Sequence, residues 1–141
     1  MSRAEALFER YGEYHRNPTN KAIHWACVPL IVWSLLGMLW AASPFAVYAA
    51  ILLAMAFYVW LPLSIAVGML LMLVVMAYLL TLLGPQVLVV SVGVFVVAWI
   101  GQFIGHAVEG RRPAFFEDIR SLLVGPAWVL AEMYRRLGIA Y

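Results

Sequence analysis

The hydrophobic pattern of this chain is dominated by one uninterrupted stretch between residues 22 and 108. Over these 87 positions there is no Asp, Glu, Lys or Arg, and most of the side chains are apolar. A water-soluble domain of this size needs ionised side chains on its surface, whereas a charged side chain at the centre of a bilayer costs about 2.5–3.5 kcal/mol. The pattern therefore predicts that this stretch is embedded in a membrane.

Proline and glycine divide the stretch into lengths that fit a bilayer. A spanning helix needs about 20 apolar residues. Residues that favour turns or helix boundaries occur at Ser43 and Pro44, at Pro62, and at Gly84 and Pro85. The spans predicted from these boundaries cover residues 22–42, 45–61, 63–83 and 86–106.

The charged N-terminal segment predicts a short amphipathic helix of its own, over residues 2–15. Ser2 and Glu5 have the spacing of a capping box, which begins a helix. Asn17 and Pro18 then interrupt it, because a residue before proline disfavours helical geometry and proline suits the first turn of a new helix. That new helix is expected to continue into the first span.

The C-terminal segment predicts a second amphipathic helix, over residues 114–137, with an expected break at Gly125 and Pro126. Helices of this kind lie along the membrane interface. The predicted fold class is therefore all-α. It is an integral membrane four-helix bundle, a single domain over residues 1–141, with amphipathic interfacial helices at both ends.

The distribution of charge predicts the orientation of this bundle. All nine Lys and Arg residues lie near the termini, and none lies in a predicted turn. An even number of spans puts both termini on one side, and the positive-inside rule makes that side the cytoplasm. The expected location is the bacterial inner membrane, or the endoplasmic reticulum in a eukaryote. A net charge of +2 is too small to indicate nucleic acid as a partner.

Three histidines bracket the charge-free stretch, with His15 and His24 at its start and His106 at its end. Four spans place His24 and His106 at the same depth on the same side, and the break at Asn17 and Pro18 lets His15 fold back toward them. Neutral imidazole is a common ligand of iron, zinc, copper and nickel. The arrangement predicts a metal site, with positions left for substrate and oxygen; the alternative, that these residues are polar interface anchors, stays open.

Polar residues at helical spacing accompany the histidines. Asn20 and Lys21 lie on the stripe of His24, while Gln102 and Glu109 lie on the stripe of His106. Glu109 is a candidate fourth metal ligand or a partner that orients His106, and an exposed charge at a helix end is the alternative.

Two further features lie at the C-terminal end of the charge-free stretch. Gly101 and Gly105 form a pair of small residues that allows another helix to approach closely. Arg111 and Arg112 are candidates to hold a substrate carboxylate, or they anchor the helix at the lipid headgroups.

The segments around the histidines resemble the motifs of a known membrane family. The first motif reads YHRNPTNKAIHW from residue 14 to residue 25 and is followed, after two residues, by VPLI at 28–31. The second reads AWIGQFIGH and ends at residue 106, and is followed by Glu109 and by RPA. A C-terminal VGP with Glu132 completes the resemblance, which spans about residues 8–133. The family is the membrane 2-hydroxy fatty acid dioxygenases, typified by a fungal enzyme of fatty acid α-oxidation in the endoplasmic reticulum, with bacterial members.

The resemblance implies an activity and a set of site residues. The implied reaction is Fe(II)-dependent and consumes O₂, and it shortens a 2-hydroxy fatty acid by one carbon at the cytoplasmic membrane interface. The metal-binding and catalytic residues of the family correspond to His15, His24 and His106 here, with Glu109 as a candidate fourth ligand. Apart from the resemblance, the residues expected to bind substrate from their positions around the histidines are Asn20, Lys21, Gln102, Arg111 and Arg112. The expected partners are membrane lipid, a 2-hydroxy fatty acid and O₂.

Two other functions are compatible with the residues alone. His24 and His106 on facing helices could be the two axial ligands of haem in a membrane electron carrier. A small scaffold or transporter without chemistry is the other alternative. It is the least favoured, because the spans carry only scattered polar residues and no continuous polar pathway across the bilayer.

Overall fold

The computed structural model describes residues 2–113 and 120–141, which form helices joined by short turns. The elements are α1 (Arg3–Gly12), α2 (Pro18–Ala42), α3 (Pro44–Tyr58), α4 (Leu63–Thr81), the short 3₁₀ helix η1 (Gly84–Gln86), α5 (Val87–Glu109) and α6 (Ser121–Leu137). The all-α prediction is confirmed for these residues. The first helix ends at Gly12, earlier than expected, so that His15 lies in the turn that follows it.

Local capping explains where α2 and α3 begin. The Asn17 side chain accepts a hydrogen bond from the backbone N–H of Thr19 at 2.9 Å, and Pro18 occupies the first turn of α2. Ser43 then caps α3 in the same way, by accepting from the N–H of Phe45 at 3.2 Å. The two helices are therefore separated by a single residue, which forces the chain to reverse sharply.

Three apolar segments of the described chain are long enough to cross a membrane: α2, α4 and the segment Gly84–Glu109 that contains α5. At 15 residues, α3 is shorter than these. Large hydrophobic side chains remain exposed on all four helices, and Phe45 and Leu63 each leave 79% of their surface uncovered. Apolar surface on this scale suits contact with lipid rather than with water.

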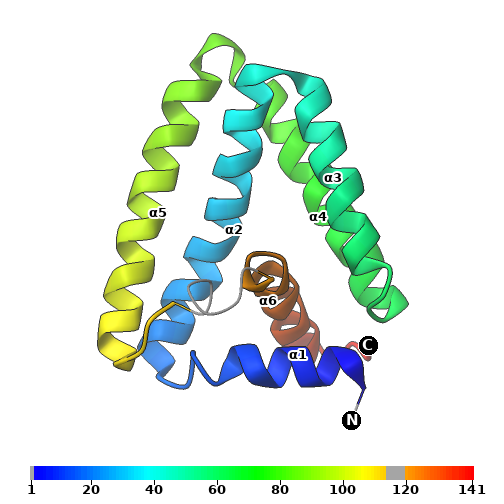
Figure 1. The fold of residues 1–141 in the computed structure, drawn as a ribbon, viewed down its shortest axis with the longest axis vertical. Coiled ribbons are helices and arrows are strands. Elements are labelled where there is room, and N and C mark those ends of the chain that lie inside the picture. Colours follow the sequence, from blue (N-terminus) through cyan, green and yellow to red (C-terminus); the bar gives the residue numbers. More distant parts are fainter. Residues whose placement is uncertain (1, 114–119) are drawn as a thin grey trace.

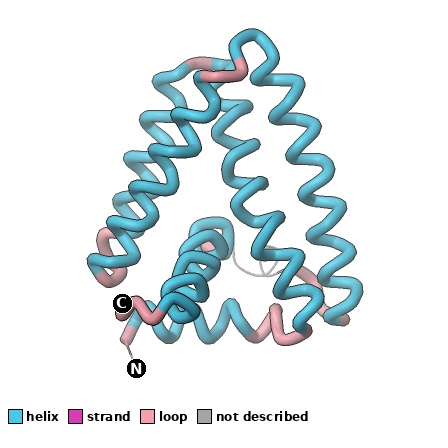
Figure 2. The backbone as a smooth tube through the Cα atoms, turned by 180° about the vertical axis from the view of Figure 1, so that it is seen from behind, coloured by secondary structure: helices cyan, strands magenta, loops and turns pink. Residues whose placement is uncertain are grey.

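The four long helices form two pairs, α2 with α5 and α3 with α4, which meet at one end and diverge at the other (Figure 1). The end at which the pairs diverge is the open end, or base, of the fold. There α6 lies between the two pairs and α1 runs across the base, and both termini are at this end. The same arrangement is visible from behind in Figure 2.

The course of α6 differs from the expectation. Gly125 and Pro126 were expected to break this segment, but α6 runs through both of them. The nine consecutive residues 124–132 are all buried, so the helix is covered on every side rather than on one stripe. A Cβ on Gly125 would lie 2.9 Å from the Tyr11 hydroxyl, so this glycine serves close packing instead of a turn. Burial of the helix compensates for the backbone hydrogen bond that Pro126 removes. Residues 114–119 of the expected helix lie outside the described residues.

Candidate metal centre

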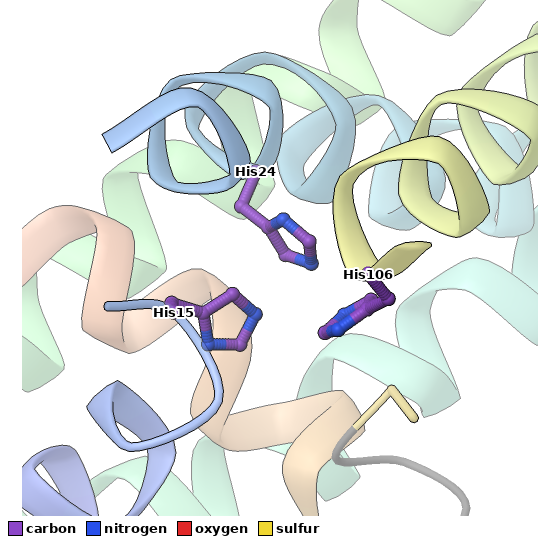
Figure 3. A group of neighbouring side chains, drawn as sticks. All are labelled: His15, His24 and His106. Carbon is purple, nitrogen blue, oxygen red and sulfur yellow. The ribbon is translucent and has the colours of Figure 1, made fainter. Parts of the chain in front are cut away.

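The three histidines come from separate segments of the chain, and their side chains lie against one another (Figure 3). His15 lies in the turn after α1, His24 in the second turn of α2, and His106 near the end of α5. Their ring centroids are 4.0 Å apart for His15 and His24, 4.6 Å for His24 and His106, and 5.2 Å for His15 and His106. All three side chains are buried, with at most 4% of their surface exposed.

One nitrogen of each ring is left without a hydrogen-bond partner. His15 Nδ1 lies 2.9 Å from the carbonyl of Tyr11, and His24 Nδ1 lies 3.0 Å from the carbonyl of Asn20. If each Nδ1 carries the proton and donates it to its carbonyl, the lone pair of each ring lies on Nε2. The buried nitrogens without a partner are Nε2 of His15, Nε2 of His24 and Nδ1 of His106.

These donor atoms fit a metal ion. One ligand atom from each histidine lies within 4.8 Å of the others. A buried polar atom without a partner costs free energy, and three of them converging on one point is an arrangement that a shared cation relieves. Nitrogen donors of this kind suit iron, zinc, copper or nickel rather than magnesium or calcium.

The surroundings of His15 keep its imidazole neutral. Burial lowers the pKa of His15 to about 4, because the charged form loses its hydration. The ring stacks on Tyr11 with centroids 4.4 Å apart and an angle of 18° between the planes. It also contacts the Trp128 ring at 5.2 Å. At neutral pH, His15 therefore offers a lone pair to a metal instead of a positive charge.

Glu109 joins three segments of the chain around the centre. Its Oε1 accepts hydrogen bonds from the backbone N–H of Asn17 at 2.8 Å and from the side-chain amide of Asn20 at 3.2 Å. The same amide of Asn20 donates to the carbonyl of Tyr14 at 3.1 Å. The end of α5, the start of α2 and the turn that carries His15 are thereby tied together. This network favours a positioning role for Glu109 over direct ligation.

Small residues on α5 allow this close contact. A Cβ on Gly105 would collide with Oδ1 of Asn20, and a Cβ on Gly101 would lie 2.7 Å from the sulfur of Cys27. The pair therefore forms the surface against which α2 packs, as their spacing predicts.

The other residues expected to bind substrate lie around the histidines at different depths. Gln102 is buried beside His24 and His106, and its Oε1 has no hydrogen-bond partner. Lys21 pairs with Glu132 on α6 at 3.2 Å and borders an open polar cleft of about 610 Å³ that also reaches His15.

The two arginines lie beyond the end of α5. The Arg111 guanidinium lies 4.2 Å from the centre of the Tyr14 ring and donates to the carbonyl of Glu13 at 3.4 Å. Arg112 is exposed and borders an open surface cleft of about 570 Å³ together with His106. Both positive charges are therefore near the histidines, just beyond the C-terminal end of the charge-free stretch.

Comparison with known proteins places this arrangement in a family. A sequence profile described as "2-hydroxy-palmitic acid dioxygenase Mpo1-like" matches residues 1–137. The chain belongs to the Mpo1-like family. A curated Mpo1-like relative, the 2-hydroxy-palmitic acid dioxygenase MPO1 of Saccharomyces cerevisiae, is 34% identical over 142 residues, which covers 91% of this chain and 78% of the yeast protein. No solved structure matches the chain. The family resemblance carried by the two histidine motifs is confirmed.

Sequence reasoning placed Glu132 in a C-terminal motif but missed the contacts that α6 makes with the site. The Trp128 ring packs on the His15 ring. The Glu132 carboxylate forms ion pairs with Lys21 at 3.2 Å and with Arg135 at 3.0 Å. Contacts between distant segments leave no local signature in hydrophobic spacing. The available signal was the C-terminal VGP motif, because its glycine is the point at which α6 approaches α1.

Proposed function

We propose that this Mpo1-like protein is an Fe(II)-dependent dioxygenase that shortens 2-hydroxy fatty acids by one carbon. The observation that carries the proposal is the convergence of three buried imidazoles, each with one nitrogen lacking a partner. The substrate class is supported by the family, since the yeast relative is named as a 2-hydroxy-palmitic acid dioxygenase.

The metal would be held by Nε2 of His15, Nε2 of His24 and Nδ1 of His106. When bound there, Fe(II) would supply the redox chemistry that O₂ needs before it can react with an organic acid. The carbonyls of Tyr11 and Asn20 fix the proton on the far nitrogen of two rings, which orients the lone pairs inward. We assign His15, His24 and His106 the catalytic role on this basis.

The head group of the substrate needs a hydrogen-bond partner for its hydroxyl and a cation for its carboxylate. Gln102 is suited to the hydroxyl because its unpartnered Oε1 is buried beside two of the histidines. Arg111, Arg112 and Lys21 are suited to the carboxylate because they carry positive charges at the clefts around the centre, which Arg135 also borders. Asn20 acts indirectly, since its amide is occupied in holding neighbouring segments together.

The proposed reaction balances without an external reductant. The bond between the first and second carbons breaks, the second carbon is oxidised to a new carboxyl group, and O₂ is reduced. One 2-hydroxy acid and one O₂ give one acid that is shorter by one carbon, one CO₂ and one water. The only co-reactant required is therefore O₂.

We also propose that the chain is a single membrane domain that crosses the bilayer four times, with both termini in the cytoplasm. The exposed apolar surface of α2, α3, α4 and α5 supports the four crossings. The position of every Lys and Arg in the terminal segments, outside the charge-free stretch, supports the cytoplasmic side for both termini. The location would be the bacterial inner membrane, or the endoplasmic reticulum in a eukaryotic source. Membrane lipid would then surround the helices and supply the substrate.

The test is product analysis with purified protein in lipid nanodiscs, supplied with Fe(II), O₂ and 2-hydroxypalmitate. We expect pentadecanoate, CO₂ and consumed O₂ in equal amounts. Palmitate, which lacks the hydroxyl, serves as the control substrate and should remain intact. The proposal is wrong if the iron-loaded protein consumes O₂ without producing pentadecanoate, or if metal-free protein retains full activity.

Haem is a weaker candidate for the same histidines. A porphyrin with two axial ligands would have to lie between His24 and His106, whose ring centroids are 4.6 Å apart. His15 packs against both of these rings, at 4.0 Å and 5.2 Å, and this contact argues against a large planar ring between them. A Soret band in protein purified from haem-supplemented cells would favour the electron carrier. A protein without metal or activity would favour the scaffold or transporter.

A further inference from the structure

A narrow cavity leads from the histidines into the apolar part of the fold. It borders His24 and His106, and it has a volume of about 40 Å³. On α2 its walls are apolar and consist of Val28, Ile31 and Val32, and α5 contributes Trp99 and the polar side chain of Gln102. Residues at the base of the fold also line it: Tyr11, Pro113, Ser121, Leu122, Gly125 and Pro126.

The direction of the cavity follows from the course of the helices. Ile31 comes seven residues after His24 on α2, and Trp99 comes seven residues before His106 on α5. Because α2 and α5 run in opposite directions side by side, both displacements point away from the base of the fold (Figure 1). Seven residues of helix correspond to about 10 Å. The α2 and α5 walls of the cavity therefore extend from the histidines toward the end that the charge-free stretch would place in the membrane.

The polar cleft at His15 has the opposite character. It is lined by ionisable side chains, including Lys21, Glu132 and Arg135, and it opens at the end of the fold where the termini lie. An alkyl chain gains free energy by leaving water at about 25 cal/mol per Å² of buried apolar surface. The tail of a fatty substrate therefore belongs in the apolar cavity rather than in this cleft.

The volume limits how much of the tail can enter. Sites that enclose a whole ligand measure about 300–1,000 Å³, and this cavity is far smaller at about 40 Å³. On α5, Ile100 follows the cavity residue Trp99 in the sequence, and Ile100 and Phe103 leave 55% and 49% of their surface exposed, which provides apolar surface for lipid. Ile31 is buried but does not pack into the main hydrophobic cluster, as expected for a side chain that faces a cavity.

We propose that this cavity is the acyl-tail site, one unbranched chain wide, which binds the carbons next to the head group and leaves the far end of the tail in the lipid. The proposal rests on the proposed function and deepens it. The protein would reject a branch close to the hydroxyl and would be indifferent to the same branch at the far end.

The first test is independent of turnover. Metal-free protein in nanodiscs is photolabelled with a 2-hydroxy fatty acid that carries a diazirine on the fifth carbon, and the labelled residues are mapped by mass spectrometry. We expect labels on Val28, Ile31, Val32 or Trp99. The same acid with the diazirine at the far end should label exposed side chains and lipid instead. Equal labelling patterns from both probes would overturn the proposal.

The second test uses the iron-loaded protein and a pair of variants on one helix. In the wild type, a methyl branch on the fourth carbon should lower kcat/KM about tenfold or more, since one extra methyl group in a hydrophobic pocket has effects of that size. A branch on the fourteenth carbon should change it less than twofold. Ile31→Ala widens the cavity and should recover most of the loss. Leu30→Ala is the matched control, because Leu30 is adjacent but 44% exposed.

Val32→Phe covers the case in which Ile31→Ala does not fold. It narrows the cavity and should lower turnover of the unbranched substrate while the protein remains folded in a thermal unfolding assay. The tail site is wrong if Ile31→Ala and Leu30→Ala give the same branch discrimination, or if the wild type does not discriminate at all. A protein that labels as expected but turns over no 2-hydroxy acid would refute the proposed function and leave the tail site standing.

Discussion

Replacing Gly105 with alanine should disturb the metal centre without altering any of its histidines. The new Cβ would collide with Oδ1 of Asn20 and would lie 3.5 Å from Ile23. Asn20 is completely buried, so its side chain has no solvent to turn into. Its amide holds the carbonyl of Tyr14 and the carboxylate of Glu109, and moving it therefore releases the turn that carries one of the ligands.

The size of the effect follows from the contacts that are lost. A hydrogen bond to a neutral carbonyl contributes about 0.5–1.5 kcal/mol, and one to a carboxylate about 1.5–3 kcal/mol. Alanine in place of glycine in a helix returns about 0.5–1 kcal/mol. The net loss in the free energy of unfolding is expected to be about 1–4 kcal/mol, and iron bound per chain should fall with it.

Gly93→Ala is the control on the same helix, because no atom lies within 4 Å of the Cβ it would add. This variant should be neutral or slightly stabilised, with its iron retained. Both variants are compared by unfolding in mixed detergent micelles and by metal analysis. The double variant Asn20→Ala/Gly105→Ala removes the collision and should be no less stable than Asn20→Ala alone. Equal stability and equal iron in Gly105→Ala and Gly93→Ala would refute the reasoning.

Three more predictions concern charge around the centre. Because burial lowers the pKa of His15 from 6.5 to about 4, the metal-free fold should lose stability as the pH falls from 6.5 toward 4. Melting curves recorded at about pH 7 and about pH 5 measure this loss, which should be smaller in His15→Asn than in the wild type. Glu132→Gln leaves Lys21 without its partner and should destabilise the protein by about 1–2 kcal/mol in denaturant titrations, with Glu9→Gln as the exposed control. Arg112→Gln should raise KM for 2-hydroxypalmitate about tenfold with kcat nearly unchanged, whereas Arg10→Gln on α1 should not, in initial-rate assays. A similar pH loss in His15→Asn, unchanged stability in Glu132→Gln, or an unchanged KM in Arg112→Gln would each contradict its prediction.

The helices that the sequence predicted well are those whose ends are set locally. Asn17 with Pro18 and Ser43 with Pro44 are cap and first-turn pairs that act within a few residues, and the structure begins α2 and α3 at these positions. The break before Pro18 also predicted that His15 could return toward His24, because on one continuous helix the two residues would lie on opposite faces and the break removes that constraint.

The properties that sequence could not supply depend on contacts between distant segments. The continuity of α6 through Pro126 accompanies burial of residues 124–132 on every side, which outweighs the local preference for a break. Spacing likewise put Glu109 near the histidines but could not distinguish a ligand from a hydrogen-bond acceptor. That distinction depends on Asn17, which is 92 residues away in the chain.

The most direct test of the central claim is the iron content of the detergent-purified protein beside His15→Ala, His24→Ala and His106→Ala, with turnover of 2-hydroxypalmitate and O₂ uptake measured on the same samples. We predict close to one iron per wild-type chain, with iron and activity lost together in all three variants. A wild-type protein that binds no iron and consumes no O₂, or a variant that keeps both, would contradict the three-histidine centre.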